Sequence, residues 1–275
     1  MKALISVDME GISGIVHSSE TNPERYDYQR GRELMTADAN AVIAGVLDAE
    51  PTADVLVADA HGTFRNLLPE RLDRRARLVR GKPRALNMLA GLDEETDAAL
   101  FVGYHVRAGE GPGVLAHTMN GEILDVRVAG RSLGEIGLNA AMAGHLGVPV
   151  VLLSGDDAAC AEATDLLPGT VTVPVKEALG MAAAVTLHPE EARDRLRRAA
   201  ADAVTRRTEI PPLALTGPLD VEADLASPHT VDLATLVPGV SRAAGARTVA
   251  FTAPDYGSAY RLILLLAQLA TIRPA

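Results

Sequence analysis

The chain has 275 residues with 26 basic and 36 acidic side chains, which give a formal net charge of −10. This length suffices for one large α/β domain or two smaller ones with a sizeable core. The charge argues against a nucleic acid or an anionic membrane surface as partner. The single cysteine, Cys160, excludes a disulfide framework and a multi-cysteine metal site. The apolar run at 262–267 is too short to span a membrane, and an acid as early as position 8 argues against a secretory leader, so we expect a cytoplasmic protein.

Short apolar runs alternate with helical patterns along the chain, which indicates an α/β fold with a largely parallel sheet flanked by helices. Strands are predicted at residues 3–7, 55–58, 98–102, 123–128 and 149–153, with a possible short strand at 78–79. Helices are predicted over residues 24–49, 135–146 and 156–166.

The pattern changes after residue 175. A charged helix is predicted over 188–207, extended chain over 213–225, a helix start at Ser227-Pro228, a strand at 247–252 and an apolar helix over 254–272. We therefore expect a soft boundary near residue 180, between an α/β domain over 1–180 and a smaller α/β part over 181–275.

Three residues that can bind metal follow three of the predicted strands directly. Asp8 ends the first apolar run, His61 follows the second, and His105 follows the strand at 98–102. Ligands bind at the carboxyl edge of open parallel sheets, so these side chains converge there if the strands are neighbours. The sequence therefore predicts a metal site at this edge, in the domain over 1–180.

Glu10 adds a second carboxylate to the first strand end. In extended chain, residues two apart point the same way, so Asp8 and Glu10 can face one site, and Gly11 then permits a sharp turn. Carboxylates together with imidazoles suit Zn²⁺ or Mn²⁺ better than Mg²⁺ or Ca²⁺.

A glycine-rich loop over residues 109–121 carries His117 and begins soon after His105, so we expect it to border the same site. A loop histidine beside a metal can act as general acid or base, or stabilise a tetrahedral intermediate. Glu135 opens a predicted helix and can supply a further carboxylate, although alone it is typical of an ordinary first-turn acid.

Each of these residues also has a structural interpretation. Alone, Asp8 or Glu10 is typical of a cap or turn, and His61 of a hydrogen-bonded loop; only their combination favours a metal site. Asp156-Asp157 fits a helix cap as well as an active-site pair. The basic stretch at 71–84 is interpreted as a solvated face, and Cys160 as a core residue. The other histidines are interpreted as structural or exposed: His17, His145, His188 and His229.

An ordered set of motifs resembles the bacterial zinc-dependent D-aminopeptidases. The opening Ser6-Val7-Asp8-Met9-Glu10-Gly11 matches their S-x-D-x-E-G signature. Further matches follow in order: Asp59-Ala60-His61, Gly103-Tyr104-His105, Pro112-Gly113-Val114, His117-Thr118-Met119, the run from Gly134 to Asn139, and Gly155-Asp156-Asp157. The resemblance runs from residue 1 to about 180 and weakens beyond it.

The resemblance implies two zinc ions per subunit and release of N-terminal D-amino acids from short peptides such as D-Ala-D-Ala. By motif position it implies the metal ligands Asp8, Glu10, His61, His105 and Glu135. It implies His117 as the catalytic histidine, and a ring-like homodecamer as the assembly.

Two other interpretations stay open on the residues alone. A two-metal site also serves phosphoesters and other amides, so another metallohydrolase fits the same pattern. A metal-stabilised oligomeric protein that binds peptides without cleaving them is the second, and in it His117 would have no kinetic role.

Overall fold

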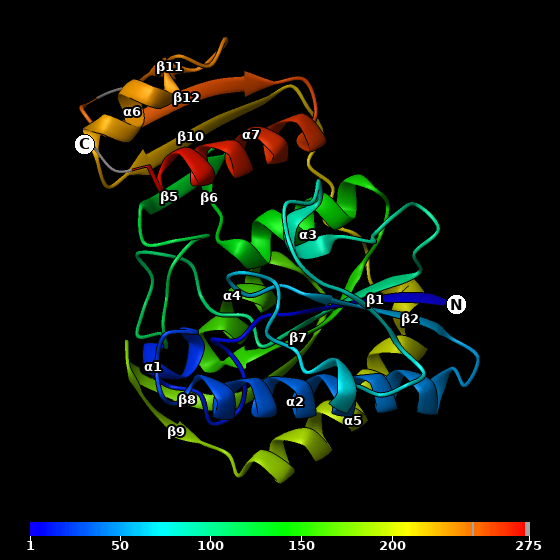
Figure 1. Ribbon diagram of the computed structural model, residues 1–275. Coiled ribbons are helices and arrows are strands. Elements are labelled where there is room, and N and C mark those ends of the chain that lie inside the picture. The colour runs from blue at the N-terminus through cyan, green and yellow to red at the C-terminus, as the bar shows by residue number, and fades with distance from the viewer. Residues whose placement is uncertain (244, 273–275) are drawn as a thin grey trace.

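The computed structural model describes residues 1–243 and 245–272, which form two β-sheets with helices packed on them (Figure 1). In spatial order, the first sheet consists of β3 (Arg77–Val79), β2 (Asp54–Asp59), β1 (Lys2–Val7), β4 (Ala98–Val102), β7 (Val150–Asp156), β8 (Val171–Gly180) and β9 (Ala183–Thr186). The second consists of β11 (Ser241–Arg242), β12 (Thr248–Ala253), β10 (Leu219–Leu225), β5 (Ile123–Val128) and β6 (Arg131–Ser132). The helices are α1 (Ser18–Thr21), α2 (Tyr28–Ala49), α3 (Glu135–His145), α4 (Asp157–Leu166), α5 (Pro189–Thr205), α6 (Pro228–Ala234) and α7 (Tyr256–Leu269).

The first sheet is parallel from β3 to β8, and only β9 runs antiparallel to its neighbour. Its strand order reverses at β1, which pairs with β2 on one side and with β4 on the other. Val7 lies opposite Asp59 on one side and opposite Val102 on the other, so the three strands end at the same level. Open α/β sheets bind their ligands at such a switch point.

Alternate residues of the first sheet pack into two separate cores. Ile5 and Val7 face the core shared with α2 and α5, whereas Leu4 and Phe101 face the core shared with α3 and α4. Figure 1 shows α2 and α5 side by side along one face of the sheet. Their close approach depends on Gly45, since a Cβ there would lie 2.2 Å from the carbonyl oxygen of Arg197.

The second sheet takes strands from both sides of residue 180. β5 pairs with β10 from the C-terminal part and with β6 on its other side, whereas α5 returns to cover the first sheet. Helix α7 packs against α3 and joins the two sheets into one core. Two buried tyrosines carry this contact: Tyr256 donates to the carbonyl of Leu138 (2.8 Å), and Tyr260 to Asn139 Oδ1 (2.7 Å). The boundary near residue 180 stays a prediction.

The predicted α/β class with a largely parallel sheet is confirmed, and several elements differ from the expected ones, among them the short α1, β6 and β11, which were not expected. The long helix was expected from residue 24 but begins at Tyr28, because Asn22 caps a turn by accepting from the backbone of Glu24. Strands β8 and β9 were not expected, and they extend the first sheet to its edge.

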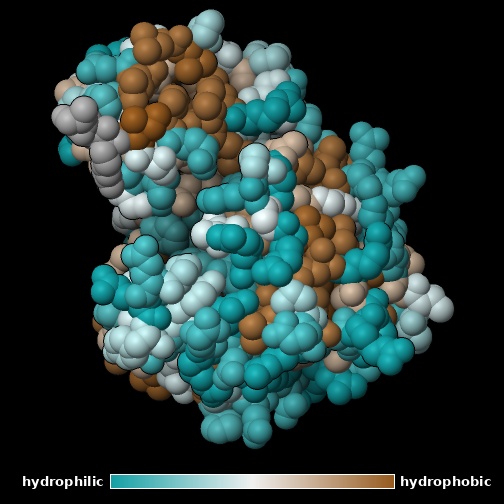
Figure 2. All heavy atoms as spheres, in the orientation of Figure 1, coloured by the Kyte–Doolittle hydropathy of each residue, from teal (hydrophilic) through white to brown (hydrophobic). Residues whose placement is uncertain are grey.

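Apolar side chains gather on the surface over the second-sheet unit, at the top of the view in Figure 2. Leu236, just after α6, is 78% exposed there. No helix within the described residues is long and apolar enough to cross a membrane.

Candidate metal centre

The six side chains predicted from the sequence lie together at the switch point of the first sheet. They are Asp8 and Glu10 after β1, His61 after β2, His105 after β4, His117 in the glycine-rich loop and Glu135 at the start of α3. The carboxyl ends of three neighbouring strands thus supply four of them, as the position of each residue in the sequence indicated.

The chain after β1 is tied directly to the chain after β4. The backbone nitrogen of Asp8 donates to Val102, and that of Gly11 donates to Gly103, both at 2.8 Å. The two segments touch so closely that a Cβ on Gly11 would lie 1.9 Å from the carbonyl oxygen of Tyr104. Gly103 has φ of +70°, a conformation that favours glycine. These contacts fix Asp8 beside His105.

A buried lysine holds the loop that follows β1 in place by hydrogen bonds. Lys176, on β8, is 3% exposed, and its Nζ donates to the carbonyl oxygens of Glu10 (2.5 Å), Ile12 (3.1 Å) and Ile15 (2.6 Å). An ammonium has three N–H groups, so all of its donors are used. Burial lowers the pKa of Lys176 to about 8. The ammonium therefore holds the backbone from which the Glu10 side chain projects.

Three buried carboxylates face one another in the site. Asp8, Glu10 and Glu135 are at most 5% exposed. Burial, and then the charge of Glu10, raise the pKa of Asp8 to about 7. Burial acts in the same direction on the other two, but His61 lowers the pKa of Glu10 and His105 lowers that of Glu135. Like charges held this close in a low-dielectric site are stabilised by positive charge among them.

Each of the three histidines has one ring nitrogen fixed by a backbone carbonyl. The pairs are His61 Nε2 with Thr21 (2.9 Å), His105 Nδ1 with Val106 (3.0 Å) and His117 Nδ1 with Leu115 (2.8 Å). A ring nitrogen that donates to a carbonyl leaves the lone pair on the opposite nitrogen, which is how proteins orient metal-binding imidazoles.

The opposite nitrogens all face the carboxylates. His61 Nδ1 lies 3.0 Å from Glu10 Oε2 and 3.4 Å from Asp8 Oδ1. His105 Nε2 lies 3.3 Å from Glu135 Oε1 and 3.6 Å from Asp8 Oδ2, yet this buried nitrogen makes no hydrogen bond with any described residue. His117 Nε2 lies 3.6 Å from Glu135 Oε1.

Electrostatics separate His117 from the other two histidines. Burial opposes protonation of all three, but the carboxylates prevail at two of them: Glu135 raises the pKa of His105 to about 10, and Glu10 raises that of His61. Burial, and then the charge of His105, lower the pKa of His117. The rings of His105 and His117 stack 4.0 Å apart. His117 is therefore the histidine held neutral.

These residues fit divalent cations. Two sets, each with ligand atoms within 4.8 Å of one another, are present: Asp8, Glu10 and His105, and His105, His117 and Glu135. The unpartnered Nε2 of His105 belongs to both. Mixed oxygen and imidazole donors of this kind suit Zn²⁺ or Mn²⁺.

The glycine-rich loop is held over the site at several points. The backbone nitrogen of Met119 donates to Glu135 Oε1 (2.7 Å), and that of Val114 donates to Asp156 Oδ2 (2.7 Å). Asp156 also caps α4 by accepting from Ala159, so the same carboxylate orders a helix and the loop. Leu115 donates to the carbonyl of Met181, beyond β8. These bonds place His117 above the carboxylates.

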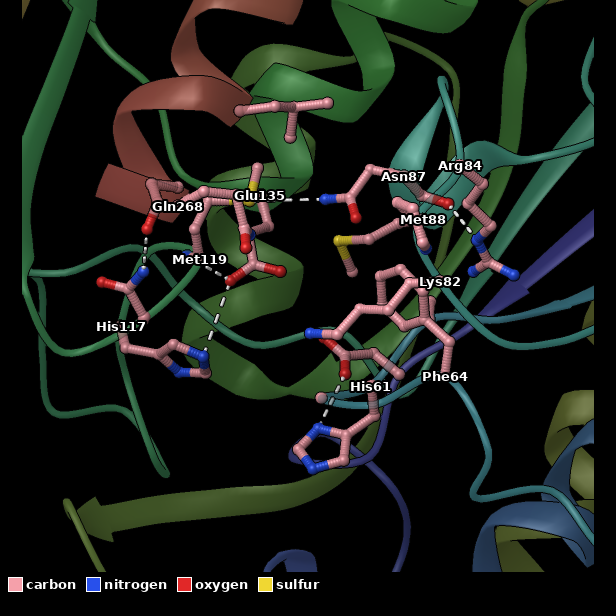
Figure 3. A pocket seen from close by; sticks show the side chains of 17 residues that line it. His61, Phe64, Lys82, Arg84, Asn87, Met88, His117, Met119, Glu135 and Gln268 are labelled. Atoms are coloured by element: carbon pink, nitrogen blue, oxygen red, sulfur yellow. Dashed lines mark hydrogen bonds and ion pairs between the residues drawn. The ribbon is translucent and has the colours of Figure 1, made fainter. Parts of the chain in front are cut away.

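A cavity of about 280 Å³ opens beside these residues (Figure 3). Its floor includes Asp8, His61, His117 and Glu135, and α7 contributes Leu264, Ala267 and Gln268. The remaining wall comes from the chain around β3, with Phe64, Lys82, Arg84 and Asn87. The cavity is therefore built from both sheet units, and its size suits a short substrate.

Comparisons with known proteins agree with this geometry. The family model for M55 peptidases, described as D-aminopeptidase, matches residues 1–265. The chain belongs to the D-aminopeptidase family. It is 37% identical over 270 residues to the D-aminopeptidase of Bacillus subtilis strain 168, with 98% of each chain covered.

A solved structure of this family superposes over the whole chain. It is the Zn-dependent D-aminopeptidase DppA from Bacillus subtilis, described as a self-compartmentalizing protease. The TM-score is 0.96 at 36% identity, and 100% of both chains is covered. The expected family is thus confirmed, and the match extends through the C-terminal part, where the motif resemblance was weak.

Several residues around the site were not singled out by the sequence. Lys176 lies in an unexpected strand, and the stretch at 71–84, interpreted as a solvated face, sends Lys82 and Arg84 to the cavity wall. Alternating charge along such a stretch carries no signal that distinguishes a cavity wall from open solvent. His17 and His188 cap α1 and α5, in agreement with a structural role.

Proposed function

We propose that this protein is a zinc-dependent aminopeptidase that releases N-terminal D-amino acids from short peptides such as D-Ala-D-Ala. The observation that carries the proposal is the set of three histidines, each fixed by a backbone carbonyl on one nitrogen and facing buried carboxylates with the other. Its relative from Bacillus subtilis is named a Zn-dependent D-aminopeptidase, which supports both the metal and the reaction.

In this proposal Asp8, Glu10, His61, His105 and Glu135 hold two zinc ions per subunit, and manganese is a possible substitute. Bound metal lowers the pKa of a coordinated water and polarises the scissile carbonyl. Asp8 and Glu10 both follow β1, so either would be suited to hold both ions. Lys176 would keep the backbone of that loop in place for these ligands.

His117 acts on the reacting atoms in this proposal. Its pKa is lowered, so it is neutral near pH 7, with Nδ1–H bonded to Leu115 and Nε2 facing the site. A neutral Nε2 can accept a proton from the attacking water and return it to the leaving amine. The stacked ring of His105 and the loop contacts hold His117 in the position from which it reaches the substrate.

The assembly is proposed to be a homo-oligomer, with a decamer expected from the family resemblance. Its relative is described as self-compartmentalizing, a property that requires several subunits around an enclosed space. A cytoplasmic location stays a prediction.

The decisive experiment compares D-Ala-D-Ala with L-Ala-L-Ala as substrates of the purified protein before chelation, after it, and after zinc is restored. Cleavage of the D-peptide alone, lost on chelation and regained with about two metals per chain, is the expected result. A phosphodiester is assayed in parallel. Metal-dependent cleavage of the phosphodiester without peptide hydrolysis would replace the proposed substrate, and turnover in metal-free protein would exclude the proposed mechanism.

A further inference from the structure

Lys82 differs from Arg84, the other cation on the cavity wall, in having no hydrogen-bond or ion-pair partner among the described residues. Arg84 donates to the carbonyl oxygens of Asn87 (2.7 Å), Val79 (3.3 Å) and Asp59, so its guanidinium is committed to the protein. Among the residues that the structure describes, none accepts a hydrogen bond from Lys82 Nζ, and no carboxylate lies within 4.0 Å of it. The ammonium of Lys82 is therefore free for a ligand.

The side chain of Lys82 is directed by an aromatic ring. Phe64 is buried, and Arg84 Cζ lies 4.1 Å from its ring centroid, with Lys82 Nζ at 5.6 Å. A cation over an aromatic face is held there by the ring quadrupole. Figure 3 shows Lys82 reaching past Phe64 into the cavity that His61 and Glu135 also line.

Among the described residues that line the cavity, none is another free cation outside the histidine and carboxylate cluster. Its other walls carry thioethers from Met88 and Met119, aliphatic side chains from α7, and the amides of Asn87, Asn120 and Gln268. An anionic substrate end entering a chain of net charge −10 would be repelled without a compensating charge. Lys82 lines the cavity next to Phe64 and is placed to supply that charge.

We propose that Lys82 is a specificity-determining residue that binds the free C-terminal carboxylate of a short peptide substrate. This inference rests on the proposed function, because the amino end and the scissile carbonyl are taken to lie at the metal centre. The C-terminal carboxylate of a short peptide then lies in the same cavity, which Lys82 lines. The enzyme accordingly prefers short peptides with a free carboxylate to the same peptides with a neutral end.

The test compares D-Ala-D-Ala with D-Ala-D-Ala amide, which has the same scissile bond and no terminal charge. For the zinc-loaded wild type, kcat/KM for the acid is expected to exceed that for the amide by about 10- to 100-fold, the range of a charge-assisted hydrogen bond. In Lys82→Met this preference should disappear through a rise in KM for the acid, with the amide unchanged, because the carboxylate is held equally in ground and transition states.

Two further variants separate a local contact from a general field effect. Lys82→Arg should keep most of the preference. Arg80→Met removes a neighbouring exposed cation that donates to Arg65 and does not line the cavity, so it should leave the preference intact. The proposal would be overturned if Lys82→Met lowered kcat/KM equally for the acid and the amide, or left the preference for the acid unchanged. Loss of the same preference in Arg80→Met would also overturn it.

Failure of the proposed function would be recognised separately, as absence of cleavage of either peptide by the wild type. In that case, calorimetric titration of both peptides into wild type and Lys82→Met tests whether Lys82 binds the carboxylate. Tighter binding of the acid that is lost in the variant supports the subsite, and equal affinities overturn it.

Discussion

At the scale of single residues, the two stacked histidines are expected to have different roles: His105 binds metal and His117 transfers a proton. His117→Ala should retain its metal but lose about 10²- to 10⁴-fold in kcat, the usual contribution of a general acid or base. The check is kcat on D-Ala-D-Ala together with the metal content of the same preparation. An unchanged kcat would remove His117 from the mechanism.

His105→Ala and His61→Ala should behave in the opposite way and lower the metal content itself. Both rings present a nitrogen to buried carboxylates, at 3.3 Å for His105 and 3.0 Å for His61. Elemental analysis after dialysis against a weak chelator measures the loss, with wild type treated in parallel. Full stoichiometry in either variant would exclude that histidine as a ligand.

Lys176 is expected to contribute strongly to stability even in metal-free protein. Lys176→Met keeps the length of the side chain but leaves the carbonyl oxygens of Glu10 and Ile15 without a donor, while that of Ile12 keeps the backbone nitrogen of Ile15. We expect a loss of about 3 kcal/mol or more in the free energy of unfolding, since each buried unsatisfied group costs about 1–3 kcal/mol. Urea unfolding measures it.

Lys2→Met is the matched control for that experiment, because Lys2 pairs with Asp93 at the surface. An exposed ion pair of this kind contributes less than about 1 kcal/mol. Similar losses in the two lysine variants would show that the loop after β1 does not depend on Lys176.

At the scale of secondary structure elements, Arg127 joins the strands of the second sheet. It donates to Asp224 (2.7 and 3.1 Å), Asp125 (2.7 Å) and Glu222 (3.0 Å), so it links β5 to β10. The hydrogen bond from Arg127 is the main reason that the pKa of Asp224 lies below its usual 3.8. A lowered carboxylate pKa stabilises the fold above the usual value, and this contribution is lost as pH falls through the lowered pKa.

Arg127→Met should therefore lower the free energy of unfolding by about 1–2 kcal/mol at pH 7. The difference from wild type should shrink as pH falls from 3.8 through the lowered pKa, at which Asp224 becomes protonated in the folded protein. Denaturant unfolding at several pH values measures both effects. Arg131→Met, which breaks the exposed pair with Asp165, is the control and should change little at any pH. A constant difference down to pH 2 would contradict the assignment.

Elements with a clear period were predictable, and those that depend on distant partners were not. The strands at β1, β2, β4 and β7 are continuous apolar runs, the pattern of strands buried on both faces. β8 contains Pro174 and Lys176, which are unusual in a strand. Pro174 lies before the segment of β8 that pairs with β9, and Lys176 donates to the loop after β1. β5 was predicted as a strand, but its sheet depends on β10, nearly a hundred residues later, so local sequence could not assign it.

At the scale of the whole molecule, a buried polar chain connects the two sheet units behind the site. Tyr260 on α7 donates to Asn139, Asn139 donates to Tyr104 (3.2 Å), and Tyr104 bonds Ser6 on β1 (2.8 Å). Asn139, Tyr104 and Ser6 each lie close to a site residue along the chain. Asn139 is one helical turn after Glu135, Tyr104 directly precedes His105, and Ser6 lies two residues before Asp8. The chain thus fixes α7 relative to the candidate ligands.

Tyr260→Phe should cost about 1–3 kcal/mol, because it leaves Asn139 Oδ1 buried without its donor. Since α7 also lines the cavity, we expect KM for D-Ala-D-Ala to rise more than kcat falls. Thermal unfolding and steady-state kinetics measure the two effects. Tyr26→Phe, at an 86% exposed position, is the control. A variant with wild-type stability and KM would show that α7 is held by other contacts.

The convergence of the candidate ligands was predictable from the sequence, whereas the substrate cavity was not. Asp8, His61 and His105 follow apolar runs, so strand ends alone placed them at one edge. Glu135 required the family resemblance, because an acid opening a helix is ordinary. The cavity wall depends on α7 crossing back over α3, a packing of segments far apart in the chain that no local pattern encodes.

The hydrogen bonds from Lys176 to the loop after β1 have a consequence for the order of synthesis, folding and metal binding. The ribosome adds Lys176 166 residues after Glu10, so the candidate ligands from β1, β2 and β4 emerge well before the ammonium that orders their backbone. Until β8 pairs with β7, the carbonyl oxygens of this loop accept hydrogen bonds from water. A metal ion that bound at this stage would bind side chains whose backbone is not yet ordered. Metal is therefore expected to bind after the protein has folded, by entering the completed cavity. It is not expected to act as a nucleus for folding of the nascent chain.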